Sequence, residues 1–297
     1  MVESGDMKFY IVTPTYNALD WLKRAIRSVA DQVREGVEVH HHVQDGASKD
    51  GTQAWLEEWQ RTHQDTPGYV FTYESCPDKG MYDALNHAWD KMPEDADITA
   101  HLNSDEQYLP DALAQVGEVF KKLAEPDMLI TTFLFLKEDG RYHCHYRPVK
   151  PTAWKCWATS MIRTSACFLN AATFSRVGIR YDISYKIIAD RKFYAQYLEK
   201  VGRVRTVPAL ITSTDAITGS NLAWSAGLQG EEDRYTASLP FWIKLVRGAV
   251  WRINHVYRRL SDKLHTAPRQ FAAYMADDSE RTMKTIEKPT CSWSKAK

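Results

Sequence analysis

The first 125 or so residues alternate between short apolar segments and segments with helical periodicity. Strand-like apolar spacing occupies Phe9–Thr13, Val37–Val43, Tyr69–Tyr73 and residues 97–103. Helical spacing follows in residues 19–31, around Trp55 to Trp59, in 81–89, and again from Pro110. Strands that alternate with helices predict an α/β domain, in which helices cover both faces of a mostly parallel sheet and the crossovers are right-handed.

The fourth predicted strand ends in an acidic turn. Ile98, Ala100 and Leu102 have the apolar rhythm of a strand, and the turn formers Asn103, Ser104, Asp105 and Glu106 follow at once. Ligands of α/β sheets bind beyond the carboxyl ends of the strands, and adjacent carboxylates there suit a hard divalent cation that holds phosphates. The turn therefore predicts a site for Mg²⁺ or Mn²⁺ with a nucleoside diphosphate.

Polar residues also follow the other three strands. The four strand ends are Thr13-Pro14-Thr15-Tyr16-Asn17, Asp45-Gly46, Asp78-Lys79-Gly80 and Asn103-Ser104-Asp105-Glu106. In a parallel sheet these ends meet at one edge. Asp45 would then accept a hydrogen bond from the imide N–H of a pyrimidine base, and Lys79 would meet a phosphate. Taken alone, Asp45-Gly46 and Asp78-Lys79-Gly80 fit ordinary turns better than a binding site, so the prediction depends on their shared edge and order.

Composition narrows the classes of partner. Lys plus Arg and Asp plus Glu are 38 each, so no overall basic field indicates nucleic acid. The apolar runs fall far short of the roughly 20 residues that span a bilayer, and the N-terminus lacks the apolar core of a signal peptide, which predicts a cytoplasmic protein. The five cysteines are scattered without a Cys-x-x-Cys pair, which argues against a disulfide framework or structural zinc.

The second half has a mixed pattern. Met128–Leu136 predicts a strand, a turn at 138–140 follows, and Arg141–Arg147 predicts its hairpin partner. Phe168 and Leu169 precede a helix near Ala171, and Tyr185–Val201 predicts another helix. Small polar residues between Ser213 and Gly230 are typical of a loop.

Residues 239–263 predict a basic amphipathic helix, and the last thirty or so residues show no periodicity. We therefore divide the chain into residues 1–235, the main domain, and residues 236–297, a helical extension with a polar tail. The helix would either pack against the main domain or dock on an anionic membrane, where Trp242, Leu245 and Trp251 enter the interface. For the second alternative, removal of residues 239–297 is expected to abolish liposome binding and to spare hydrolysis of the donor.

An ordered set of segments resembles the family 2 glycosyltransferases of GT-A fold that build bacterial surface glycans. The segments are Thr13–Asn17, Asp45-Gly-Ala-Ser-Lys-Asp-Gly-Thr52, Pro77-Asp-Lys-Gly-Met-Tyr-Asp-Ala-Leu-Asn86, Asn103-Ser-Asp-Glu, Cys167-Phe-Leu and Tyr181-Asp-Ile-Ser-Tyr-Lys-Ile-Ile-Ala-Asp190. Any one of them is a weak signal, but their order and spacing match over roughly residues 8–225.

The resemblance implies inverting, metal-dependent transfer from a UDP-, GDP- or dTDP-sugar to a hydroxyl of a glycan or lipid-linked acceptor in surface polysaccharide synthesis. Asp190 occupies the position of the catalytic base, Asp45 that of the base-recognising acid, and Asp105 with Glu106 that of the metal ligands. The implied donor site contains Thr13, Thr15, Tyr16, Asn17, Asp45, Gly46, Asp78, Lys79, Gly80, Asp83, Asn103, Ser104 and Asp105. The implied location is the cytoplasm, with peripheral attachment to the inner face of the plasma membrane.

The chain departs from the family pattern at two places. Glu106 stands where the family usually has a second aspartate, and its longer arm moves the ligand outward by one methylene. Thr164-Ser165 stands where the family often has His-Gln, which concerns contacts with the acceptor. On that side Trp154, Trp157 and Phe168 are the predicted acceptor contacts. The Glu106 departure keeps open an alternative, a non-catalytic relative that binds nucleotide sugar or glycan.

Overall fold

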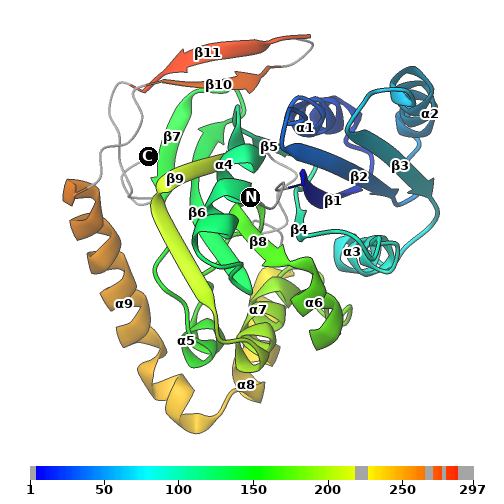
Figure 1. Cartoon of the computed structure of the whole chain (residues 1–297). Coiled ribbons are helices and arrows are strands. Elements are labelled where there is room, and N and C mark those ends of the chain that lie inside the picture. The colour runs from blue at the N-terminus through cyan, green and yellow to red at the C-terminus, as the bar shows by residue number, and fades with distance from the viewer. Residues whose placement is uncertain (1–4, 218–226, 265–269, 276–278, 287–297) are drawn as a thin grey trace.

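A computed structural model describes residues 5–217, 227–264, 270–275 and 279–286 of the chain (Figure 1). Its centre is a nine-stranded sheet with the order β3-β2-β1-β4-β8-β6-β9-β5, to which β7 is added beside β6. A separate two-stranded sheet, β10-β11, lies near the C-terminus. The element order in the first half is the predicted alternation of strands and helices.

The parallel half of the sheet contains the first four strands. They are β1 (Met7–Thr15), β2 (Val37–Asp45), β3 (Tyr69–Ser75) and β4 (Ile98–His101), and each pair of neighbours is parallel. The helices between them are α1 (Leu19–Ala30), α2 (Thr52–His63) and α3 (Met81–Trp89), and α4 (Ala112–Lys122) comes later. The prediction of a largely parallel α/β sheet is confirmed.

Alternation along β1 divides the core into two layers. Phe9 and Ile11 pack in the same apolar cluster as buried residues of α1, α2 and α4. Tyr10 and Val12 pack on the other face with α3 and with α7 (Ala189–Lys200). Helices therefore cover both faces, because successive side chains of a strand point to opposite sides.

The rest of the sheet is mixed. The strand β8 (Cys167–Asn170) is antiparallel to both β4 and β6 (Met128–Lys137), and β7 (Tyr142–Tyr146) forms the predicted hairpin with β6. The strand β9 (Val204–Ile217) runs parallel to β6 and antiparallel to β5 (Glu106–Tyr108). The short elements α5 (Ala153–Ala158), η1 (Thr164–Ala166) and α6 (Ala171–Val177) connect β7, β8 and α7.

The predicted loop from Ser213 to Gly230 is wrong at both ends. β9 continues to Ile217, and α8 (Leu228–Ser238) begins before Gly230, while residues 218–226 lie outside the described part. Ser213 and Thr214 pair through their backbones with β5 and β6 and are almost fully buried. Small polar side chains fit this interior position, so composition alone predicted a loop where the chain continues as a strand.

The helix α9 (Phe241–Leu264) runs along the side of the molecule opposite α2 and α3 (Figure 1). Ile243, Val250 and Asn254 are buried against the main domain, so the packing alternative is confirmed for this face. The other face remains in solvent with several large apolar side chains, including Leu245 at 67% and Ile253 at 66% exposure. Within the described residues, every helix is too short or too polar to cross a membrane.

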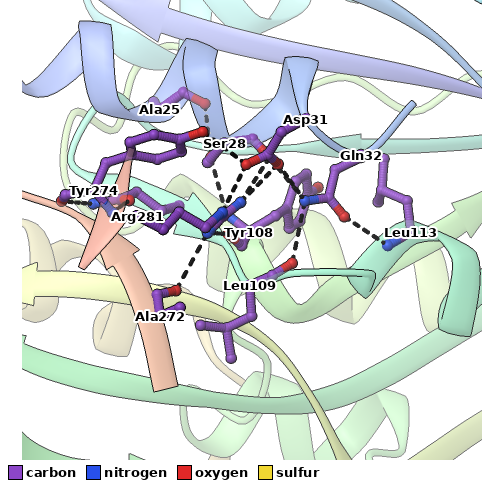
Figure 2. Close-up of polar contacts among 11 residues, drawn as sticks. Ala25, Ser28, Asp31, Gln32, Tyr108, Leu109, Leu113, Ala272, Tyr274 and Arg281 are labelled. Atoms are coloured by element: carbon purple, nitrogen blue, oxygen red, sulfur yellow. Dashed lines mark hydrogen bonds and ion pairs between the residues drawn. The ribbon is translucent and has the colours of Figure 1, made fainter. Parts of the chain in front are cut away.

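The described residues of the C-terminal tail form two strands where we predicted no structure. β10 (Gln270–Tyr274) and β11 (Arg281–Thr285) form an antiparallel hairpin that packs beside α1 and β5. The Arg281 guanidinium forms a two-pronged ion pair with Asp31, at 2.6 and 2.7 Å, and donates to the carbonyl of Tyr108 (Figure 2). These partners lie far away in the sequence, which explains why local periodicity did not indicate the hairpin.

Candidate functional site

The four predicted strand ends lie at one edge of the sheet. Thr15 pairs with Asp45, and Asp45 pairs with Ser75 on the next strand. The amide of Leu102 donates to the carbonyl of Val12 at 3.0 Å, which places the acidic turn beside the end of β1. The structure therefore brings together the segments that the sequence predicted to converge.

Hydrogen bonds connect the turns after β1 and β2. The Asn17 amide donates to Ser48 Oγ, and the Lys49 amide donates to Asn17 Oδ1, both at 2.8 Å. Asn17 has a φ of 47°, a left-handed conformation in which asparagine is enriched. These contacts assign Asn17 a clear role, which is to hold the two turns together.

Three of the predicted donor contacts are buried, namely Thr13, Thr15 and Asp45. The Asp45 carboxylate is 0% exposed and accepts hydrogen bonds from the hydroxyl groups of Ser48 and Ser75, at 2.5 and 2.6 Å. The Thr13 hydroxyl lies 2.9 Å from Nε2 of His41 in the interior of the sheet. We therefore no longer expect Thr13 to contact the nucleotide sugar. Asp45 can contact the base only if one of its hydrogen bonds with serine breaks.

The turn before α3 contains the more accessible side chains. A Cβ atom on Gly46 would lie only 2.8 Å from Asp78 Oδ2, so these two segments approach where a larger residue does not fit. Asp78 accepts from the Gly80 amide, and Asp83 accepts from the Lys79 amide, which fixes the turn. The Lys79 side chain is exposed, and Tyr16 beside Gly46 is 65% exposed.

The acidic turn has one buried and one half-buried carboxylate. The Glu106 side chain is buried, and its Oε2 accepts a hydrogen bond of 2.6 Å from the Asn103 amide. Asp105 is half-buried, and Asn103 Oδ1 is buried with no hydrogen-bond donor among the residues that the structure describes. The oxygen atoms of Asn103 and Asp105 suit a hard cation, whereas Glu106 is already engaged by its own turn.

A third carboxylate lies beside this turn. Asp215 on β9 is directly opposite Glu106 on β5. Burial and the nearby Asp105 raise the pKa of Glu106 to about 8, and burial with Glu106 and Asp105 raises the pKa of Asp215 well above its ordinary value. Asp215 was missed because it falls in the segment that we predicted as a loop. Even so, no cluster of three His, Cys, Asp or Glu residues suited to a metal ion occurs in the described part of the chain.

Asp190 is the second residue of α7, which begins at Ala189. The Tyr82 hydroxyl donates to the Ile187 carbonyl at 2.8 Å and lies 3.5 Å from Asp190 Oδ1, so α3 connects Asp190 to the Asp78 turn. Burial raises the pKa of Asp190, and Arg191 and Arg163 act in the opposite direction. A carboxylate with a raised pKa is a better proton acceptor near neutral pH.

Glu231 on α8 supports the loop before Asp190. Its carboxylate accepts hydrogen bonds from three consecutive backbone amides, those of Lys186, Ile187 and Ile188, at 2.5, 2.9 and 3.3 Å. The sequence gave no signal for this contact, because 45 residues separate Glu231 from Lys186. Glu231 thereby fixes the segment from which α7 begins.

The predicted acceptor residues differ in position. Trp154 is 39% exposed and lies 6.1 Å from the ring of Trp242 on α9. Trp157 stacks on Tyr235, and its indole N–H donates to Glu199. Phe168 is 0% exposed and stacks on Tyr108 in the core between the sheet and α4, so it does not reach an acceptor, and that prediction is withdrawn.

Comparison with known proteins gives a family. The model of Glycosyl transferase family 2 matches residues 10–186. Two uncharacterized glycosyltransferases of Mycobacterium tuberculosis, from strains CDC 1551 and H37Rv, are each 33% identical over 185 residues. That match covers 62% of this chain and 66% of theirs, slightly less than two thirds of their length.

Solved structures have the same fold. S. aureus TarS has a TM-score of 0.59 at 12% identity, with 93% of this chain and 60% of TarS covered. TarS 1-349 in complex with UDP-GlcNAc has a TM-score of 0.60 at 14% identity, covering 87% and 74%. Mannosyltransferase PcManGT from Pyrobaculum calidifontis, in complex with GDP-Man and Mn²⁺, has a TM-score of 0.56 at 18% identity, covering 87% and 80%. The chain belongs to glycosyltransferase family 2, and its mixed α/β fold is that of the GT-A glycosyltransferases.

Proposed function

We propose that the chain transfers a sugar from a nucleoside-diphosphate sugar to a hydroxyl group of a glycan or lipid-linked acceptor. The observation that carries the proposal is the position of Asp190, which α3 ties to the strand-end turns through Tyr82. Family membership supports it, as do neighbours of the same fold that were solved with UDP-GlcNAc, UDP and GDP-Man.

The donor would lie over the strand ends. The exposed ring of Tyr16 offers a face for the base, and the exposed ammonium of Lys79 offers a charge for the diphosphate. A divalent cation held by Asp105 and the Asn103 side-chain oxygen would neutralise negative charge on the departing diphosphate. Glu106 as a direct metal ligand remains a prediction, and its bond to the Asn103 amide favours a supporting role.

The transfer itself would be inverting. Asp190 takes the proton from the acceptor hydroxyl as its oxygen forms a bond to the anomeric carbon. The bond from that carbon to the diphosphate oxygen breaks on the opposite face, and the electron pair leaves with the nucleoside diphosphate. A one-step displacement requires a base and no protein nucleophile. The Asp190 carboxylate, at the N-terminal end of α7, would be that base.

The exposed face of α9 supports a location at an anionic membrane. Lys244, Arg252 and Arg259 are exposed among Leu245 and Ile253, and cations around an apolar face suit anionic headgroups. Deletion of residues 239–297 no longer tests this well, because the deleted part contains the hairpin that packs on β5. We expect the L245E/I253E variant to lose binding to phosphatidylglycerol vesicles, whereas Val70→Glu, at a strand position that is 54% exposed, keeps it. Equal loss by both variants would contradict membrane docking.

The proposed function is tested with a panel of donors. UDP-, GDP- and dTDP-sugars are titrated and assayed for hydrolysis with Mn²⁺ or Mg²⁺. One nucleotide is expected to bind and to be hydrolysed faster than it is without protein. Binding without turnover would favour the non-catalytic alternative, and the absence of both with every donor would overturn the proposal.

A further inference from the structure

A cavity lies away from the strand-end turns. It has a volume of about 480 Å³ and is enclosed by the β6–β7 hairpin, residues 159–163, the start of α7, α8 and α9. None of the residues predicted to bind the donor lines it. Arg163 and Arg191 line it, and the positive charges of both act to lower the pKa of Asp190. The cavity therefore lies near the proposed base, whose sequence neighbour Arg191 is part of its lining.

The wall of this cavity is strongly cationic. Arg163, Arg191, Arg247 and Arg258 line it together with a single carboxylate, Glu232. The Glu232 carboxylate accepts hydrogen bonds from both terminal nitrogens of Arg191, at 3.0 and 2.6 Å, and lies 3.4 Å from Nη2 of Arg247. The carboxylates of Asp190 and Asp215 also interact electrostatically with Arg163, although neither residue lines the cavity. Four guanidinium groups around one lining carboxylate favour an anion in the cavity.

Three buried donors on the wall have no acceptor among the described residues. They are Nε of Arg163, Nε of Arg191 and Nδ2 of Asn254. Asn254 is only 4% exposed and lines the cavity from α9. A buried N–H without an acceptor typically costs roughly 1–3 kcal/mol. All three belong to residues that line the cavity, and a ligand with several acceptor oxygens would satisfy the donors that it reaches.

The polar residues of α9 that line the cavity are spaced so that they can contact one ligand. Arg247, Asn254 and Arg258 are separated by seven and four residues, which places them on one face of a helix. Arg247 and Arg258 are half-buried, whereas Arg252 and Arg259 on the same helix point to solvent. One of the two alternatives from the sequence turned the cations of this helix toward a membrane, but part of that charge lines the cavity.

We propose that this cavity binds a phosphate group carried by the acceptor and thereby presents the acceptor hydroxyl to Asp190. This inference rests on the proposed transferase function and names the chemical class of its acceptor. A phosphate fits better than a carboxylate, because its tetrahedral oxygens can engage guanidinium groups and an amide from several directions at once. The phosphate would belong either to a soluble glycan or to a lipid carrier.

The test measures phosphate binding to the full chain by calorimetry, with UDP or GDP present at a saturating concentration. Inorganic phosphate is expected to bind, and acetate at the same ionic strength is expected to bind at least tenfold more weakly. Arg163→Gln and Asn254→Leu are each expected to weaken phosphate binding at least tenfold. The control Arg176→Gln, at an exposed position of α6, leaves it unchanged. Asn254→Leu replaces the amide with a side chain of similar size, so it remains informative if Arg163→Gln fails to fold.

Several results would overturn the inference. They are no phosphate binding, displacement of phosphate by the nucleotide, equal affinity for acetate, or undiminished binding by both cavity variants. Donor binding and hydrolysis measured in parallel separate this failure from failure of the proposed function. Glycerol 3-phosphate in solution and phosphatidic acid in vesicles then distinguish the sources. The proposal is supported if either compound binds and Asn254→Leu weakens that binding. Tighter binding of glycerol 3-phosphate indicates a soluble acceptor, and tighter binding of phosphatidic acid indicates a lipid-linked acceptor.

Discussion

The ion pair between Arg281 and Asp31 gives a prediction that links the C-terminal hairpin to the donor site. Arg281 also donates to the carbonyl of Tyr108 at 2.8 Å, and the Gln107 side chain exchanges two hydrogen bonds with the backbone of Tyr274, at 3.0 and 2.8 Å. Both Gln107 and Tyr108 belong to β5, which begins at Glu106 of the acidic turn. The hairpin therefore clamps the strand that follows the proposed metal site (Figure 2).

The expected cost of removing Arg281 follows from its surroundings. Its side chain is 11% exposed and that of Asp31 is 32% exposed. Breaking a buried pair costs about 3–5 kcal/mol, and hydrogen bonds to charged groups contribute about 1.5–3 kcal/mol each. Because Asp31 keeps some solvent and the hydroxyl of Tyr274, we expect Arg281→Met to lower the free energy of unfolding by about 2–4 kcal/mol.

The matched control is Arg61→Met. Arg61 and Glu58 are also 2.6 Å apart, but their side chains are 68% and 59% exposed, so we expect no measurable change. Urea unfolding followed by tryptophan fluorescence measures both variants, and hydrogen exchange of the Tyr274 amide reports local loosening of the hairpin. A further Asp31→Ala substitution in Arg281→Met should cost less than it does in the wild-type protein. If Arg281→Met is no more destabilising than Arg61→Met, the clamp does not exist.

Three further predictions concern the candidate site. Because burial raises the pKa of Asp190, the rate of donor hydrolysis should fall as the pH drops through a value above the ordinary aspartate range, and a pH profile that stays flat to pH 4 would contradict this assignment. Gly46→Ala should weaken nucleotide binding about tenfold in calorimetry, since its Cβ would displace Asp78, whereas Gly202→Ala has open space and should not; equal effects would refute the close approach. Glu231→Gln should lower kcat more than it raises KM, because the loop before Asp190 loses acceptor strength at three amides, and an effect on KM alone would exclude this positioning role.

Local patterns in the sequence predicted the parallel half of the fold well. Apolar alternation in β1 to β4 and helical spacing in α1 to α3 agree with their structures, because these elements are contiguous and bury a regular face. The first strand was predicted to end at Thr13, but β1 continues to Thr15. The helix predicted from Tyr185 begins only at Ala189, because Glu231 holds the preceding amides in a different arrangement.

Long-range pairing explains most of what the sequence could not predict. β9 contains small polar residues that are buried only because β5 and β6 flank them, and β10–β11 depends on Asp31 and Gln107. The candidate site was predicted at the level of segments, since strand ends in a parallel sheet must meet at one edge. Which side chains face a ligand was not predictable, as the buried positions of Thr13, Asp45 and Phe168 show.

The central claim is that Asp190 acts as the base of a sugar transfer, and Asp190→Asn tests it most directly. The measurement compares hydrolysis of the preferred donor with its affinity, for this variant and for the exposed control Asp233→Asn. We predict that hydrolysis by Asp190→Asn falls roughly 10²- to 10⁴-fold while donor affinity stays within about twofold. Hydrolysis by Asp190→Asn at the rate of Asp233→Asn, with donor still bound, would contradict the claim.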